Sequence, residues 1–183
     1  MLITISGLPG SGTTTVSKLL SKAHNVEFVS VGDLFRKIAK EKNLSVLEFN
    51  ELAEKDYSID FEIDEYQKKV IKTMNTGILE GRLSGHFANK MSKDVSTIRI
   101  WIKAPIEIRA KRIAKRKSIS YDDALSETIE REKSECARYK TIYEMDINNL
   151  SIYDIIIDSN GWKSHDIMNI LKKSIDCFNK RIH

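Results

Sequence analysis

The architecture of this 183-residue chain follows from one stretch, Gly7-Leu8-Pro9-Gly10-Ser11-Gly12-Thr13-Thr14-Thr15. It lies between the apolar run Leu2–Ile5 and a helical pattern, the context of a phosphate-binding loop, G-x-x-x-x-G-K-[ST]. The glycines of such a loop let backbone N–H groups turn inward around a polyphosphate, and the helix N-terminus adds partial positive charge. Gly7, Gly12 and the hydroxyl residue Thr14 fit the pattern. The stretch therefore predicts a site for a nucleotide polyphosphate.

The loop departs from this pattern at one position. Thr13 stands where a lysine normally reaches the transferring phosphates. If the loop binds a nucleotide for catalysis, positive charge must reach the phosphates from elsewhere in the chain. The alternative is an ordinary strand–turn–helix connection whose glycines serve backbone geometry alone.

The composition indicates a soluble globular protein. Charged residues make up 31% and hydrophobic residues 41%, and there are only two prolines. The length suits one α/β domain with small mobile subdomains. No apolar run approaches membrane-spanning length and the chain starts without a signal segment, so we expect a cytoplasmic location and no membrane partner. Cys136 and Cys177 are far apart, which favours reduced thiols without a catalytic role.

The net charge of +4 is compatible with two kinds of partner. A small excess of basic residues suits an enzyme whose substrates are polyanionic nucleotides. Lysine and arginine are spread along the chain, with a denser stretch at Arg109–Lys117, so we expect no stable nucleic-acid partner and keep RNA binding as a minor hypothesis. The sequence does not determine the oligomeric state, and we favour a monomer.

Strand and helix patterns alternate along the chain, which predicts a parallel sheet with helices on both faces. The expected strands are Leu2–Ser6, Glu27–Ser30, Gly77–Glu80, Thr97–Lys103 and Ile152–Asp158. The expected helices are Thr13–Ala23, Leu34–Lys42, Ser45–Glu54, Asp60–Met74, Pro105–Lys117, Tyr121–Tyr143 and Ser164–Phe178. Residues 34–74 and 112–143 are helical, polar and too long for simple crossovers, so we expect them to close over substrates at the carboxyl edge of the sheet.

Two strand ends carry an acid followed by an arginine. Asp33 and Arg36 follow the second strand. Glu80 is the last residue of the third strand, and Arg82 follows it. At the carboxyl edge of the sheet, the acids would lie near a metal and the arginines could clamp phosphate groups. The alternative for each acid is helix capping or a surface position.

These motifs together resemble the cytidylate kinase family of nucleoside monophosphate kinases, in particular its archaeal form, whose phosphate loop likewise ends Gly-Thr-Thr-Thr. The resemblance covers nearly the whole chain and includes the Arg109/Arg112/Arg116 helix, the Arg131–Arg138 helix and Tyr153-Asp154. It implies a three-layer α/β/α P-loop fold with a five-stranded parallel sheet, and transfer of the ATP γ-phosphate to CMP or dCMP. The core would be residues 1–33, 75–112 and 144–183, with an NMP-binding excursion at about 34–74 and a LID with its following helix at about 113–143.

The resemblance also implies residue roles. The loop Gly7–Thr15 would bind ATP, Thr14 would ligate Mg²⁺, and Asp33 and Glu80 would hold metal-bound waters. Arg36 and Arg82 would grip the CMP phosphate.

A further set of arginines would supply the charge that Thr13 lacks. Arg131, Glu135 and Arg138 share one helix face by spacing. The resemblance makes the two arginines phosphate ligands and assigns the ribose hydroxyls to Glu135, while the alternative is an i,i+4 ion pair on a solvated face. Arg112 and Arg116 are the other catalytic candidates, and the alternative for them is a role away from the phosphates.

Base recognition departs from the bacterial pattern, because Leu83 stands where bacterial relatives carry an aspartate. Cytosine presents an N4 donor beside N3 and O2 acceptors, so its pocket needs a carboxylate or carbonyl and a nearby donor. Asp60 and Asp64, one helical turn apart, with Gln67 one turn further on, are the candidates. The alternative is a polar helix face.

The implied reaction needs no general base, since a phosphate monoester is already ionised at neutral pH. Catalysis would consist of in-line positioning and neutralisation of charge by Mg²⁺ and converging arginines. Two other functions stay open from the sequence. One is an adenylate kinase, and the other is an RNA-linked ATPase, although the chain has few aromatic residues and no RNA-binding motif.

Overall fold

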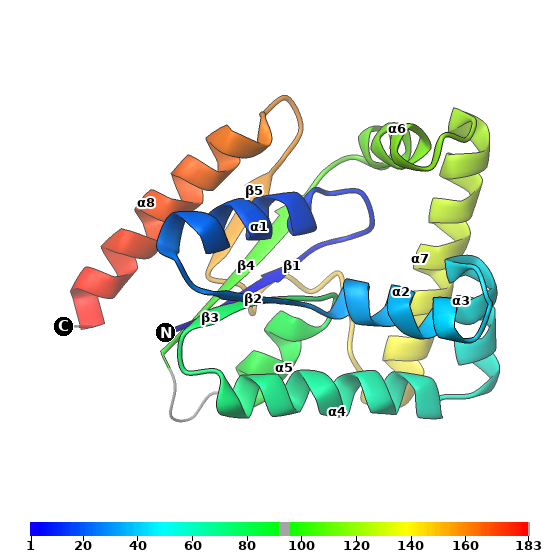
Figure 1. The fold of residues 1–183 in the computed structure, drawn as a ribbon, viewed down its shortest axis with the longest axis horizontal. Helices are drawn as coiled ribbons and strands as arrows, with labels where there is room; N and C mark the ends of the chain where they lie inside the picture. The colour runs from blue at the N-terminus through cyan, green and yellow to red at the C-terminus, as the bar shows by residue number, and fades with distance from the viewer. Residues whose placement is uncertain (92–95, 183) are drawn as a thin grey trace.

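The computed structural model describes residues 1–91 and 96–182, and within them a five-stranded parallel sheet forms the centre of the protein (Figure 1). The strand order is β2-β3-β1-β4-β5. The strands are β1 (Leu2–Ser6), β2 (Glu27–Ser30), β3 (Gly77–Glu80), β4 (Thr97–Lys103) and β5 (Ile155–Asp158). Every residue of β1 is buried, as expected for a central parallel strand covered on both faces. The predicted fold class is confirmed.

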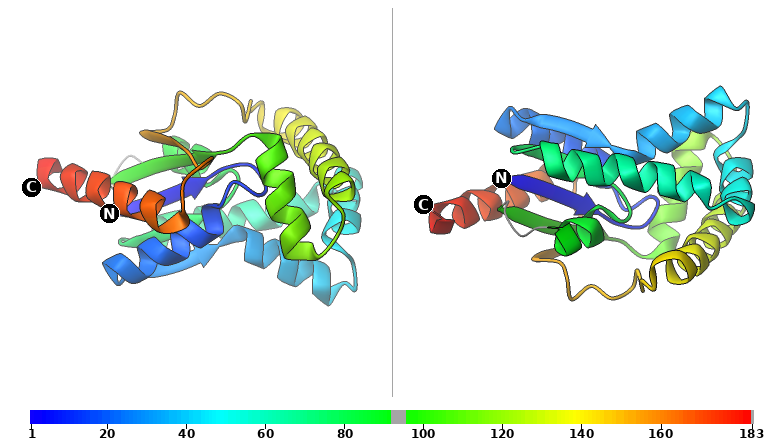
Figure 2. Two further views of the ribbon diagram at one scale, coloured as in Figure 1. Left: turned by 90° about the horizontal axis from the view of Figure 1, so that it is seen from above. Right: turned by 90° about the horizontal axis from the view of Figure 1, so that it is seen from below.

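Helices cover both faces of this sheet. They are α1 (Thr13–His24), α2 (Val31–Glu41), α3 (Val46–Lys55), α4 (Ser58–Thr73), α5 (Ser84–Met91), α6 (Ile106–Lys117), α7 (Tyr121–Tyr143) and α8 (Ser164–Ile182). Figure 1 shows α1 and α8 above the sheet and α4 and α5 below it. The helices α2, α3, α6 and α7 extend beyond the carboxyl ends of the strands, at the end of the molecule away from both termini (Figure 2).

Each sheet face has its own apolar core. On the α1 and α8 face, Ile5, Ile100 and Leu171 are fully buried. The opposite core reaches under the outer helices, where Phe49 of α3 is fully buried and contacts Phe35 of α2, with ring centroids 4.7 Å apart. The outer helices are therefore packed on the same core that supports the sheet.

Local capping fixes the starts of the outer helices. Ser45 and Glu48 form a capping box at α3, and the Ser120 side chain accepts a hydrogen bond from the Asp123 N–H at α7. Ser30 caps α2, which begins at Val31 and not at Leu34 as predicted. Asp33, expected between the second strand and a helix, therefore lies in the first turn of that helix.

Two other predictions about the elements are wrong. The sequence prediction missed α5, where a Ser-Gly-His start weakens the helical pattern. Gly85 is needed there because a Cβ atom would lie 2.4 Å from the Tyr153 ring. The last strand begins at Ile155 and not at Ile152, since Tyr153 closes a turn with Leu150 and Asp154 pairs with Arg99 at 2.8 Å.

The described part of the chain holds no helix that is long and apolar enough to cross a membrane.

Candidate active site

A cavity opens beyond the carboxyl ends of β1, β2 and β3. Its walls come from the phosphate loop, the start of α2, the buried face of α4, the turn Glu80–Leu83, and polar positions of α6 and α7. These are the segments that the sequence placed around a phosphate site. The parallel topology explains this convergence, because every strand ends at the same edge.

The phosphate loop has the backbone that its glycines predict. Gly10 and Gly12 have φ angles of 83° and 96°, in the region that favours glycine. A Cβ atom on Gly10 would lie 2.7 Å from the carbonyl oxygen of Arg109, so α6 sits directly against the loop.

Arg112 holds this loop from outside. Its Nη1 donates to the carbonyl oxygens of Gly10 and Ser11, both at 3.3 Å, and to Ser159 Oγ at 2.8 Å. Its Nη2 donates to the Ser159 carbonyl oxygen at 2.8 Å. Burial lowers the pKa of Arg112, against the opposing charge of Asp158. Arg112 therefore lies against the backbone of the loop, and its predicted contact with phosphate stays a prediction.

Glu80, at the end of β3, accepts hydrogen bonds from three hydroxyl groups. Its Oε1 accepts from Thr13 at 2.8 Å and from Thr14 at 3.3 Å, and its Oε2 accepts from Ser30 at 2.6 Å. This donor set contains oxygen atoms only, which fits Mg²⁺. No cluster of three or more His, Cys, Asp or Glu side chains able to hold a metal occurs among the described residues, so such an ion would depend on nucleotide phosphates and waters as well.

Asp33 and Arg36 face each other at the start of α2. Arg36 Nη2 lies 2.6 Å from Asp33 Oδ1, and about half of each side chain is exposed. In this arrangement the Asp33 carboxylate pairs with Arg36, one helical turn away. Its predicted link to metal-bound water is not tested by this geometry.

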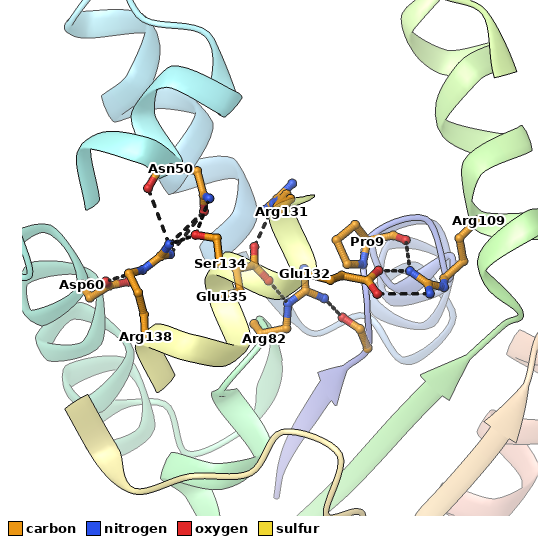
Figure 3. A network of polar contacts seen from close by, with 11 residues as sticks. Pro9, Asn50, Asp60, Arg82, Arg109, Arg131, Glu132, Ser134, Glu135 and Arg138 are labelled. Atoms are coloured by element: carbon orange, nitrogen blue, oxygen red, sulfur yellow. Dashed lines mark hydrogen bonds and ion pairs between the residues drawn. The ribbon is translucent and has the colours of Figure 1, made fainter. Parts of the chain in front are cut away.

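Glu135 joins two arginines in the wall of the cavity (Figure 3). Its Oε2 accepts from Arg82 Nε and its Oε1 from Arg131 Nε, each at 2.7 Å, and Arg82 Nη1 also donates to the carbonyl oxygen of Gly7. Burial alone would raise the pKa of Glu135, but the two positive charges outweigh it and hold the pKa at about 2. The carboxylate is thus charged at neutral pH and orients both guanidinium groups.

Arg116 has the fewest polar contacts of the arginines that line this cavity. It lines the cavity, its side chain is exposed there, and it has no hydrogen-bond or ion-pair partner among the described residues. Partial burial and the positive charges of Arg36 and Arg131 lower its pKa. Arg36 and Arg131 therefore repel Arg116, and this repulsion is relieved when an anion binds between the three arginines.

Arg138 lies deeper and is fully engaged (Figure 3). Its Nε donates to Asp60 Oδ2 at 2.9 Å, and its Nη atoms donate to Ser134 Oγ at 2.7 Å and to Asn50 Oδ1 at 3.2 Å. Burial raises the pKa of Asp60 and outweighs the charge of Arg138. In this arrangement Arg138 joins α3, α4 and α7, and its role on the phosphates stays a prediction.

Asp64 lines the same end of the cavity and favours its neutral form. Burial, followed by the charge of Asp60, raises its pKa to about 8. Its Oδ1 accepts from Gln67 Nε2 at 3.1 Å, and its Oδ2 contacts the hydroxyl of Tyr143. The predicted trio Asp60, Asp64 and Gln67 therefore lies together on the buried face of α4, and all three line the cavity.

A second cavity lies on the other side of the phosphate loop. Its walls include Gly12–Val16, Arg112 and the segment Trp162–Ser164, and about half of the Trp162 side chain is exposed. No sequence pattern points to Trp162, because it is a lone aromatic residue in a loop.

The sequence gives no signal for Glu132, Asn50 and Ser134 as partners of the arginines at the site. Arg109 lies in the basic stretch predicted to form part of a flap, and the alternative of a solvated side chain is wrong, since only 4% of Arg109 is exposed. Its partner Glu132 is 23 positions away, so no local spacing signals the contact. Cys136 and Cys177 are free cysteines, as expected.

Comparisons with known proteins give one consistent result. The model of the Cytidylate kinase-like family matches residues 2–161. The chain is 53% identical over 177 residues to the cytidylate kinase of Methanosarcina barkeri, covering 96% of this chain and 97% of that protein. It is 44% identical over 182 residues to the cytidylate kinase of Methanocaldococcus jannaschii, covering 98% and 100%.

Solved structures support the fold. The shikimate kinase of Bacteroides thetaiotaomicron has a TM-score of 0.61 at 14% identity, covering 96% of this chain and 98% of that chain. The shikimate kinase of Aquifex aeolicus has a TM-score of 0.57 at 21% identity, covering 96% of each chain. The three-layer α/β/α arrangement is therefore that of known kinases.

Proposed function

The chain belongs to the cytidylate kinase-like family of nucleoside monophosphate kinases, and on that premise we propose that its cavity transfers the γ-phosphate of ATP to CMP, giving CDP and ADP. One observation carries the proposal: a phosphate loop and a group of arginines face one cavity whose other end holds buried carboxyl groups. The first two would align two phosphates, and the last would read a polar base. We propose dCMP as a second acceptor.

The donor nucleotide would occupy the phosphate loop Gly7–Thr15 and the second cavity behind it. Backbone N–H groups and the N-terminus of α1 would bind its phosphates. The side chains of Arg112 and Trp162 offer flat surfaces for its base in that cavity.

The acceptor phosphate would be held by Arg36, Arg82 and Arg131. Each lines the cavity, and guanidinium groups bind phosphate oxygens through paired N–H donors. Arg82 and Arg131 are pre-oriented by Glu135, so less side-chain entropy is lost on binding.

Arg116 would replace the missing lysine of the loop. It lines the cavity, and a guanidinium without a carboxylate partner can place its full charge on the transferring phosphoryl group. Arg138 is also a predicted phosphate ligand. It would reach the phosphates only if acceptor binding drew its guanidinium away from Asp60.

The oxygen ligands at Glu80 fit Mg²⁺ as a companion of ATP. Thr14 would ligate the ion directly, and Glu80 and Asp33 would hold its waters. Mg²⁺ held there would neutralise part of the charge of the phosphates. The proposal is supported by the hydrogen bonds that Thr13, Thr14 and Ser30 donate to Glu80, which gather their hydroxyl oxygens around its carboxylate.

The buried carboxyl groups of α4 would recognise the base. A protonated Asp64 offers one hydrogen-bond donor and one acceptor, which matches the N3 acceptor and N4 donor of cytosine. Asp60 and Gln67 lie beside it, and the apolar Leu83 forms part of the same wall. A ribose contact by Glu135 would have to use the lone pairs left free by its two arginines.

We propose that α2–α4 and the α6–α7 segment move toward each other around bound substrates. Closure would exclude water, which otherwise accepts the phosphoryl group and wastes ATP. We further propose a monomeric cytoplasmic enzyme without a stable nucleic-acid partner. The two widely separated free cysteines support the cytoplasmic location, and the dispersed basic residues support the absence of a stable nucleic-acid partner.

The proposed activity is tested by a panel of acceptors. With ATP and Mg²⁺, we expect kcat/KM for CMP and dCMP to exceed that for AMP and GMP by about 100-fold or more, since a pocket built for specific hydrogen bonds leaves polar groups unpaired with a wrong base. UMP completes the panel. Coupled measurement of ADP formation provides the rates. A preference for AMP, or no preference at all, would contradict the proposal.

A further inference from the structure

The carbonyl oxygens on the outside of the phosphate loop are all occupied. A loop that turns its N–H groups inward must turn carbonyl groups outward, and buried carbonyl groups need donors. The oxygen of Gly7 accepts from Arg82, that of Leu8 from the Ser11 N–H at 3.1 Å, that of Pro9 from Arg109 at 3.3 Å, those of Gly10 and Ser11 from Arg112 at 3.3 Å, and that of Gly12 from the Val16 N–H at 3.1 Å. By contrast, the N–H groups of Gly10 and Gly12 donate to no protein atom in the described ranges.

Three arginines thus define the shape of the loop from behind. Arg82 lines the first cavity and Arg112 lines the second, so both belong to the site already described. Arg109 lines neither cavity. It is buried, and its function has to be sought in its contacts.

Arg109 joins three parts of the protein, and Figure 3 shows two of its partners, Pro9 and Glu132. Its Nε donates to the Ala104 carbonyl oxygen at 2.9 Å, at the end of β4, and its Nη1 donates to Pro9 of the loop. Both Nη atoms also face Glu132 of α7, with Nη2 3.4 Å from Oε2. Only 5% of the Arg109 side chain and 17% of the Glu132 side chain are exposed.

Glu132 lies on the part of α7 that carries the acceptor-side charges. Arg131 is its neighbour in sequence and Glu135 is one helical turn away, and these two residues form the ion pair that also holds Arg82. A shift of α7 relative to the loop would therefore move Arg131 relative to the inward N–H groups.

We propose that Arg109 and Glu132 are positioning residues for phosphoryl transfer, which lock α7 to the phosphate loop so that the donor phosphates and the acceptor-side arginines are in register. The inference rests on the proposed function. In-line transfer depends on the alignment of the reacting groups, and a displacement of about 1 Å costs about 100-fold in rate. Substrate affinity depends on it much less, because the arginines and the loop each keep their own ligands.

The test is Glu132→Gln, which keeps the shape of the side chain and removes the charge that holds Arg109. We expect kcat with ATP and CMP to fall between about 10- and 100-fold, while both KM values change less than about threefold. Arg109→Gln should give a similar loss, and the double variant should be no slower than either, because the two residues act as a unit.

Glu127→Gln is the matched control. Glu127 also pairs α7 with α6, through Lys117, but this pair is partly exposed and touches no loop carbonyl. Its removal should leave kcat unchanged. Melting temperatures of all variants separate loss of rate from loss of structure, and Arg109→Lys, which keeps charge but not the fork geometry, provides a second variant if Glu132→Gln does not fold.

The inference is overturned if folded Glu132→Gln keeps kcat within twofold of wild type, or if this variant loses activity through a higher KM and not through a lower kcat. It is also overturned if Glu127→Gln is equally slow. The same holds if no variant of the Arg109–Glu132 pair folds. The wild-type chain is measured in the same assay. Absence of CMP phosphorylation there would remove the proposed function, whereas equal wild-type and variant rates would remove only this inference.

Discussion

Arg116→Met is expected to lower kcat by about 1,000-fold while ATP affinity changes less than about threefold, because an arginine that neutralises the transferring phosphoryl group acts mainly in the transition state. Thr13 offers no charge to the γ-phosphate. Arg116 faces the cavity without a carboxylate partner in the described part of the chain, and methionine preserves most of its length. Single-turnover rates with CMP, together with calorimetric titration of ATP, measure the two quantities separately.

Lys111→Met is the control for this variant. Lys111 also lies on α6 and carries a positive charge, but it is exposed and lines none of the cavities described above. Its rate should equal that of the wild type. If Arg116→Met kept a rate within tenfold of wild type, the charge on the transferring group would have to come from another residue.

Arg138→Met is expected to lower the free energy of unfolding by about 3–5 kcal/mol, since removing one partner of a buried ion pair leaves the other charge uncompensated. Arg138 and Asp60 are 4% and 9% exposed in their side chains, and their contact is 2.9 Å. Asn50 Oδ1 would lose its donors from Arg138 as well, and Ser134 Oγ would keep the hydrogen bond from Asn50 Nδ2. Urea denaturation followed by circular dichroism measures the change.

Two further variants check the cause of that loss. Asp60→Asn combined with Arg138→Met removes both charges and should recover part of the stability. Lys37→Met breaks a pair with Glu41 in which both side chains are mostly exposed, and it should change the free energy of unfolding by less than about 1 kcal/mol. A loss below about 1 kcal/mol for Arg138→Met would show that another group compensates the charge of Asp60.

Much of the fold could be predicted because local patterns determine it. The strands Gly77–Glu80 and Thr97–Lys103 are short apolar runs bounded by polar segments, and their predicted limits match the structure. The helix Tyr121–Tyr143 carries a capping serine before an acidic first turn. Helix α5 escaped prediction because its burial comes from the fold: Gly85 lets it approach Tyr153, a contact between distant positions.

The candidate site could be predicted in part for the same reason. Glycine spacing and strand ends brought Gly7, Glu80 and Arg82 to one cavity. The partners of each arginine could not be predicted, because a guanidinium binds whatever acceptor the tertiary structure presents. Spacing placed Arg131, Glu135 and Arg138 on one face, yet only the first two pair with each other, and Arg138 turns to Asp60.

The central claim is that the phosphate loop binds the donor while arginines outside the loop provide the charge for transfer. Thr13→Lys tests it most directly, because it restores the lysine of the usual pattern at the position where Thr13 now donates to Glu80. The measurement is the single-turnover rate of phosphoryl transfer from ATP to CMP. The account predicts a rate no higher than that of the wild type, since Arg116 and Arg131 already face the site. A rise of about tenfold or more, equal to about 1.4 kcal/mol of barrier, would contradict it.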